Sequence, residues 1–261
     1  GSHHEWVKGA EKWVLIAGID DATSDILYGE FFKVESLEGY LEVLREIFAR
    51  YGVPRILYVD RAGWLSGTTR TDEGGQFQRM CEELGIHLIF ANSPQAKGRI
   101  ERAWLTLQDR LIAEFRFWGI KTMQEATKYF NEQFLVNTWR PLFTVKQESL
   151  EKAYLTPPES KELDRIFCLK FERKIRRDHT ILWGNRTYQI TTKLKYSIAG
   201  RKLELRVNSK GDLTPVFAGK ELELTEVKKV EDRGPSPGLR IDPKSLKESH
   251  SVGRKIVKSN T

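Results

Sequence analysis

Short apolar runs in the first 140 residues predict four β-strands. The runs at 12–20 and 26–34 predict a hairpin, and the continuous apolar character of the first indicates a central strand buried on both faces. Further strands are predicted at 55–60 and 87–91, the latter as a short buried strand.

Helices are predicted between and after these strands. Apolar residues at helical spacing indicate helices from Ser36, as N-cap, to Tyr51 and around 77–84, the latter ended by Gly85. A third helix is predicted from about Ile100, with Ile100, Ala103, Trp104, Leu107 and Leu111 as its inward stripe. A capping box at Thr122 opens a fourth, running to about Trp139. The first 140 residues therefore predict a mixed α/β domain.

Two segments interrupt the regular pattern. Residues 61–75 are rich in glycine and polar side chains and predict an irregular loop of a length that is usually mobile or functional. The proline-containing segment 156–160 predicts a domain boundary.

Beyond this boundary the chain changes to short β-rich runs separated by turn residues. The predicted runs are 166–175, 180–183, 186–190, 202–208 and 213–227. Turns at this spacing predict a small antiparallel barrel. The expected organisation is therefore an α/β domain at 1–155, a barrel at 160–228 and a basic flexible tail at 229–261.

Charge differs sharply between the two parts of the chain. Residues 1–160 carry 19 Lys and Arg against 23 Asp and Glu, whereas residues 161–261 carry 24 against 13. This asymmetry indicates a polyanionic partner for the second part, most simply nucleic acid, although a solvated basic surface that aids solubility would give the same composition.

Several protein classes are not indicated. No run approaches the roughly 18 to 20 apolar residues of a membrane span, and no signal peptide is recognised, so a cytoplasmic protein with no membrane partner is expected. Cys81 and Cys168 are too few for a disulfide framework or zinc cluster, and the histidines are too scattered to form a metal site.

The segment Ser93-Pro-Gln-Ala-Lys-Gly-Arg-Ile-Glu-Arg102 connects a predicted strand to the third helix. It places Glu101 on the expected first turn of that helix, where the macrodipole favours negative charge. Glu101 could be an ordinary first-turn glutamate. Asp60, however, ends another predicted strand, and both carboxylates could face the same sheet end and, with a third, coordinate two Mg²⁺ ions for phosphoryl transfer.

The order of elements, the motif Tyr58-Val-Asp60 and the segment Ser93–Glu101 resemble the integrase core of D-D-E transposases. These bacterial insertion-sequence enzymes are related to retroviral integrases. The resemblance covers roughly residues 1–140, and Pro-Gln-x-x-Gly-x-x-Glu101 is its most specific part. The strands beyond residue 166 resemble the small β-barrel of Mu-like transposases.

The resemblance implies an RNase H-like mixed sheet with flanking helices, followed by a small all-β, SH3-like barrel. It implies transposon-end cleavage and strand transfer with two Mg²⁺ or Mn²⁺ ions, and it places two of the catalytic and metal-binding acids at Asp60 and Glu101. The 40 residues between them exceed the retroviral spacing, and the excess lies in the loop 61–75.

The expected partners are transposon ends and target DNA, bound by a homodimer or larger multimer in the bacterial cytoplasm and nucleoid. DNA contacts through phosphates are expected at a set of polar and cationic residues, each of which could equally be a solvated surface residue: Gln95, Lys97, Arg99, Arg102, Arg173, Lys174, Arg176 and Arg177.

One departure from the family pattern concerns the first catalytic aspartate. Relatives read Asp-Gly-x-x-His-x-Trp on their first strand, and this chain begins Gly1-Ser-His-His4-Glu-Trp6. We expect the missing acid directly before Gly1, with Asp20 and Asp21 as fallback candidates and weak or absent catalysis by the chain as it stands. Residues 1–4 could also be an expression-tag remnant.

Two other functions remain open. One is a DNA-binding or assembly module, derived from a transposase, whose catalytic site is incomplete. The other is an RNase H-like nuclease acting on RNA–DNA hybrids, which the segment 93–102 disfavours.

Overall fold

The computed structural model of the chain describes residues 1–59, 65, 72–90, 94–147 and 153–229, with only the backbone described at 94–99 and 228–229. It divides into two compact units, residues 1–159 and 160–261. No helix among the described residues combines the length and apolar character of a membrane span.

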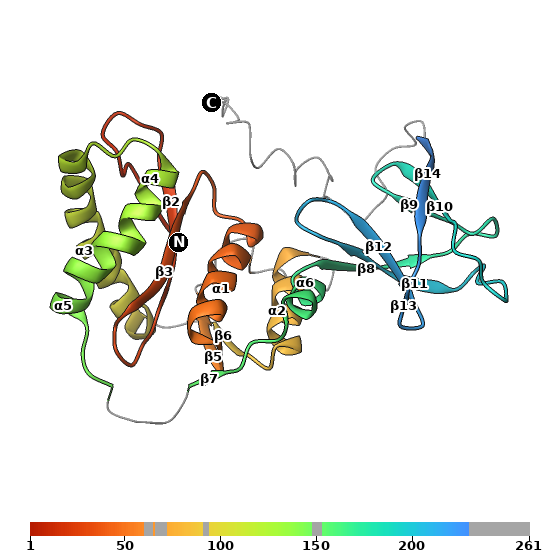
Figure 1. The fold of residues 1–261 in the computed structure, drawn as a ribbon, viewed down its shortest axis with the longest axis horizontal. Coiled ribbons are helices and arrows are strands. Elements are labelled where there is room, and N and C mark those ends of the chain that lie inside the picture. The colour runs from red at the N-terminus through yellow and green to blue at the C-terminus, as the bar shows by residue number, and fades with distance from the viewer. Residues whose placement is uncertain (60–64, 66–71, 91–93, 148–152, 230–261) are drawn as a thin grey trace, which may run out of the picture. The chain divides into compact units, whose positions relative to one another are not determined.

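The first unit is organised around an antiparallel sheet with the order β1-β2-β3, formed by Ser2–His4, Trp13–Ile19 and Ile26–Phe32. The predicted hairpin is confirmed as the pair β2 and β3. Alternate side chains of β2 enter different parts of the core, as the period of a strand requires. Leu15 packs among the helices that follow residue 94, whereas Ile16 faces Gly39 of α1. Both faces of β2 are therefore covered (Figure 1).

Helix α1, Leu37–Tyr51, begins and ends at the predicted residues. The Ser36 hydroxyl accepts a hydrogen bond from the Gly39 amide, and Gly52 ends the helix at φ +100°. A short pair, β4 (Val53–Pro54) with β7 (Tyr154–Leu155), follows immediately. A Cβ atom at residue 52 would lie 2.5 Å from the Leu155 carbonyl oxygen. Glycine is thus required by backbone conformation and by the close approach of β7.

Strands β5 (Ile56–Val59) and β6 (His87–Phe90) form a parallel pair. The prediction that β6 is buried was wrong, because His87 is exposed and the next three residues are only half-buried. In the described ranges no ladder joins this pair to β1-β2-β3.

Helix α2, Glu73–Glu83, begins earlier than predicted. Gly74 and Gly75 had been assigned to the loop on their low helix propensity, but they lie within the first turn. The Asp72 carboxylate caps this turn by accepting a hydrogen bond from the Gly75 amide at 2.7 Å. A strong N-cap and the burial of Phe77 outweigh the cost of the two glycines.

The long helix α3, Pro94–Trp118, packs with a second helical segment on one side of the sheet. That segment comprises α4 (Met123–Tyr129), a π-helix (Phe130–Trp139) and α5 (Arg140–Phe143). The predicted capping box at Thr122 is confirmed. Ala103, Leu107 and Leu111 are buried as predicted, but Ile100 is 37% exposed, contrary to the expected stripe.

The second unit begins with a short helix that was not predicted, α6 (Ser160–Ile166), whose Leu163 and Ile166 are buried one turn apart. Up to residue 229, where the described part of this unit ends, seven strands follow in two antiparallel sheets, β14-β10-β9 and β13-β12-β11-β8. Their bounds are β8 Leu169–Lys174, β9 Thr180–Trp183, β10 Arg186–Ile190, β11 Lys202–Val207, β12 Leu213–Phe217, β13 Lys220–Glu221 and β14 Leu224–Lys229. Alternating residues such as Leu203, Leu205 and Val207 fill the core between them.

Candidate functional site

Glu101 lies on α3, but not in its first turn. The helix starts at Pro94, so Glu101 is its eighth residue, roughly 10 Å along the axis from the first. The prediction of a first-turn carboxylate was wrong because Pro94 is acceptable at a helix start and residues 95–97 are good helix formers. The macrodipole falls off within one turn, so it does not explain a carboxylate at this position.

The side chain of Glu101 is exposed. Residues seven apart on a helix lie on nearly the same face, so Glu101 shares a face with Gln108. The Gln108 amide donates a hydrogen bond to the Ser2 hydroxyl on β1 at 2.8 Å, and Ser2 is buried. The face of α3 that carries Glu101 therefore also contacts the first strand of the sheet.

Asp60 lies outside the described residues, but the strand that precedes it is described. Val59 pairs with Phe90 at the ends of the parallel strands β5 and β6. Asp60 follows Val59 directly, and α3 begins four residues after Phe90. Because the two strands are parallel, their C-terminal ends lie on the same side of the pair.

The fallback candidates Asp20 and Asp21 lie in the turn between β2 and β3. The Asp20 carboxylate accepts a hydrogen bond from the Ala22 amide at 3.0 Å, which is a local turn contact. Nearby, Asp25 pairs with Arg140 at 3.2 Å and thereby holds the turn against α5. These contacts give the acidic turn a structural role.

Of the remaining predicted residues in the first unit, Gln95, Lys97 and Arg99 are on the described backbone of α3, but their side chains lie outside the described residues. Arg102 is exposed next to Glu101. Among the described residues, no group of three or more His, Cys, Asp or Glu side chains is placed to hold a metal ion. A metal site that includes Glu101 would need ligands from outside the described part of the chain.

The predicted DNA contacts of the second unit do not share one environment. Lys174, Arg176 and Arg177 are exposed. Arg173 is half-buried, and its guanidinium lies 4.9 Å from the centre of the Trp183 ring. Burial lowers the pKa of the Arg173 guanidinium. Arg173 therefore contributes to packing, whereas the other three project into solvent.

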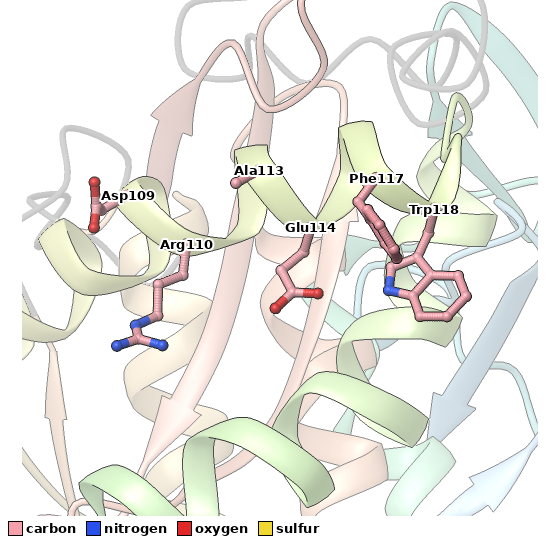
Figure 2. A pocket seen from close by; sticks show the side chains of 6 residues that line it. All are labelled: Asp109, Arg110, Ala113, Glu114, Phe117 and Trp118. Atoms are coloured by element: carbon pink, nitrogen blue, oxygen red, sulfur yellow. The ribbon is translucent and has the colours of Figure 1, made fainter.

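A shallow groove of about 650 Å³ lies along the C-terminal part of α3, beyond Glu101 in the sequence. Figure 2 shows its lining residues Asp109, Arg110, Ala113, Glu114, Phe117 and Trp118. Three of them also make contacts within the helical layer. The guanidinium of Arg110 lies 5.2 Å from the Phe143 ring centre, Glu114 accepts a 2.6 Å hydrogen bond from the Tyr129 hydroxyl, and the Trp118 ring packs beside Tyr129. These contacts join α3 to the helical segment 123–143.

One exposed aromatic residue in the second unit was missed by the sequence prediction. Tyr196 lies in the loop between β10 and β11 and is 56% exposed. The signal was present, because Tyr196 follows Lys193 and Lys195 in a polar, β-poor segment.

Comparison with known proteins shows similarity to transposases. The chain is 35% identical over 200 residues to the transposase for insertion sequence IS1202 of Streptococcus pneumoniae, covering 72% of this chain and 40% of that protein. It is 28% identical over 235 residues to the putative transposase y4bF of Sinorhizobium fredii (strain NBRC 101917 / NGR234), covering 85% and 50%. The chain thus spans between 40% and 50% of the length of these relatives. No family model matches it.

A solved structure also aligns with the chain. It is the cryo-EM structure of the simian T-cell lymphotropic virus intasome in complex with PP2A regulatory subunit B56 gamma. The alignment covers 87% of this chain and 79% of that chain, with 14% identity and a TM-score of 0.41. This superposition is too loose to establish a shared fold.

Proposed function

We propose that the chain is the core of a D-D-E transposase, which cleaves transposon ends and joins them to target DNA by metal-dependent phosphoryl transfer. The similarity to two transposases carries this proposal. The proposed architecture is an RNase H-like sheet with flanking helices, which β5 and β6 would extend, followed by a small SH3-like barrel in the second unit.

Asp60 and Glu101 are the proposed metal-binding acids. The described elements support this pairing in two ways. The parallel strands β5, which ends one residue before Asp60, and β6, which ends four residues before α3, finish side by side, and Glu101 shares its helix face with a residue that contacts β1. A third acid carried by the first strand would therefore approach the face of α3 on which Glu101 lies.

The donor set fits Mg²⁺ or Mn²⁺, because carboxylate oxygens are the ligands that these ions prefer. When bound, a pair of such ions would activate the attacking oxygen and stabilise the leaving oxygen in an in-line displacement. The contribution of this chain is the exposed carboxylate of Glu101, together with Asp60. Arg102, Lys97 and Arg99 would hold DNA phosphates by charge, with Gln95 as a neutral contact. We also propose that the active form is a multimer on paired DNA ends.

The test measures Mg²⁺- and Mn²⁺-dependent nicking and strand transfer on labelled DNA that carries the terminal repeat of the encoding element. Two proteins are compared: this chain, and the same chain with an aspartate added before Gly1. Activity of the extended protein alone would support a three-carboxylate site. We expect Glu101→Gln to reduce its rate by at least about 100-fold, since a ligand worth several kcal/mol is lost. Glu132→Gln, at an exposed glutamate elsewhere in the unit, is the matched control.

Two outcomes would contradict this assignment. Activity of the unextended chain that survives in an Asp20→Ala/Asp21→Ala double variant would refute the expected need for an added acid. Inactivity of both proteins, with salt-sensitive DNA binding intact, would favour the alternative function, a DNA-binding or assembly module without catalysis.

A further inference from the structure

A turn and a loop of the second unit lie side by side and expose an aromatic ring among cations. The turn is 176–179, between β8 and β9, and the loop is 191–201, between β10 and β11. The Gly200 amide donates to the Ile175 carbonyl and the Ile175 amide donates to the Arg201 carbonyl, each at 2.8 Å. His179 Nε2 lies 2.9 Å from the Ser197 hydroxyl. These bonds fix the two segments against each other.

Tyr196 is held at the surface of this pair by its neighbours. Ile198, two residues later, is completely buried and anchors the loop in the core. The Ser197 hydroxyl also accepts a hydrogen bond from the Ala199 amide at 3.3 Å. Tyr196 itself is 56% exposed, with the Arg201 guanidinium 5.9 Å from its ring centre. The Arg201 guanidinium thus lies over the ring, while more than half of the Tyr196 surface faces water.

The charges around Tyr196 are predominantly positive. The cations of the two segments and the adjoining strand ends are Lys174, Arg176, Arg177, Lys193, Lys195, Arg201 and Lys202. The neighbouring carboxylates are fewer, and two of them make contacts of their own. Glu172 pairs with Lys202 at 2.6 Å, and Asp178 accepts a 2.7 Å hydrogen bond from the Thr180 hydroxyl. Glu223 lies beside the start of the loop, where its amide donates to the Thr192 hydroxyl.

We infer that this turn–loop patch binds single-stranded or unpaired nucleic acid, with Tyr196 stacking on a base and the surrounding cations holding the phosphates. A cationic surface alone would bind the backbone of any nucleic acid. An exposed ring offers a flat face that a base in a duplex cannot reach and that an unpaired base can cover. The Arg201 guanidinium lies over the Tyr196 ring and would add a cation–π contact to the stack of ring and base. The inference rests on the proposed function for its DNA substrate and adds a preference for unpaired strands.

The test is equilibrium binding of the full chain in EDTA, measured by fluorescence anisotropy. Two labelled single strands of equal phosphate number are compared, a mixed-sequence strand of about 12 nucleotides and the same strand made entirely of abasic sites, and the third probe is the full duplex of the mixed-sequence strand. We expect the base-bearing single strand to bind about 5- to 100-fold more tightly than the abasic strand, the range that stacking of one base produces. Tyr196→Ala should abolish this difference, and Tyr196→Phe should retain it.

Two further variants separate stacking from charge. Lys193→Ala/Lys195→Ala should weaken binding of all three probes and reduce the dependence of affinity on salt. Phe117→Ala removes a comparably exposed ring, 79% exposed, from the first unit and should change nothing. Equal binding of base-bearing and abasic strands, or an unchanged preference in a folded Tyr196→Ala variant, would overturn the inference. Because EDTA excludes metal-dependent chemistry, this result is independent of whether Asp60 and Glu101 catalyse strand transfer.

Discussion

The guanidinium of Arg173 lies over the ring of Trp183, 4.9 Å from its centre, and 5.5 Å from the centre of the Phe171 ring. Its Nη1 atom also donates a hydrogen bond to the Glu172 carbonyl at 2.8 Å. Arg173 had been grouped with Arg177 as a DNA contact on charge alone. Its position against two core aromatic rings separates the two arginines physically.

Arg173→Ala should therefore lower the free energy of unfolding of the second unit. The loss should be about 1 to 2 kcal/mol, from the cation–π contact and the packing of the side-chain stem. Arg177→Ala, at an exposed turn position, should stay within about 0.5 kcal/mol of the parent. Urea unfolding followed by far-UV circular dichroism measures both, and equal destabilisation by the two variants would contradict this role.

Side chains of the helical segment satisfy the outer edge of β3. The Asn131 side chain accepts from the Gly29 amide at 3.2 Å and donates to the Gly29 carbonyl at 2.7 Å, while the Thr127 hydroxyl accepts from the Phe31 amide at 3.1 Å. Asn131→Ala should cost about 1 to 3 kcal/mol, because the part-buried amide and carbonyl of Gly29 lose their side-chain partner. Asn137→Ala, exposed on the same π-helix, is the matched control. Chemical denaturation compares them, and a cost as small as that of the control would refute the edge-covering role.

The capping box of α4 predicts a pH-dependent contribution to stability. Hydrogen bonds from the amides of Lys121 and Thr122, and contact with the Thr122 hydroxyl, hold the pKa of the Glu125 carboxyl below its usual value. Because the pKa is lower in the folded state, the stabilisation is complete above the unfolded pKa and is lost as pH falls through the folded pKa. The parent should therefore be more stable than Glu125→Gln at neutral pH, and this difference in stability should disappear below about pH 4.

Thr122→Ala removes the other half of the capping box. It should cost about 1 kcal/mol, and this loss should persist at low pH because a hydroxyl does not titrate in this range. Thermal unfolding at several pH values distinguishes the two variants. If the stability difference between the parent and Glu125→Gln did not vary with pH, the assigned role of the Glu125 carboxylate in the capping box would be contradicted.

The buried cysteines should be unreactive in the folded protein. Burial raises the pKa of the Cys81 thiol to about 12, with a further contribution from Glu82. At pH 8 the thiolate fraction would then be about one part in ten thousand. Cys168 is also buried, and its thiol lies 3.0 Å from the Arg165 carbonyl oxygen. Ellman's reagent should modify neither cysteine in the folded protein and both cysteines in denaturant. Rapid modification of the folded protein would show that the structure around a cysteine opens.

The sequence correctly predicted the elements whose capping residues and apolar pattern lie within one short segment of the chain. Ser36 and Thr122 cap helices as predicted because capping depends on a side chain and the amides three residues away. The hairpin of β2 and β3 was likewise readable, since a nearly uninterrupted apolar run followed by a turn leaves few other structures.

Glu101 and Gly74 show where local reading failed. The helix of Glu101 includes Pro94 and Gly98, and the first turn of α2 includes Gly74 and Gly75, although such residues usually end or interrupt a helix. Propensity differences of about 1 kcal/mol at such positions are smaller than the free energy gained by burying a helix face or adding an N-cap. Burial of Phe77 is a property of the assembled unit, so the extension of α2 could not be read from its first residues. The early start of α3 rests instead on local residues, Pro94 and 95–97, which are compatible with a helix start.

The sequence by itself determined the α/β character of the first part, the β character of the second and the residue types available for phosphate and metal chemistry. Only the tertiary structure decided which other segments each of those residues lies against. It placed Glu101 on the helix face that contacts β1, set the half-buried Arg173 against Trp183 and brought the turn 176–179 beside the loop that exposes Tyr196. The physical reason is that periodicity and capping act within a few residues, whereas these contacts join segments distant in sequence through burial and backbone hydrogen bonds.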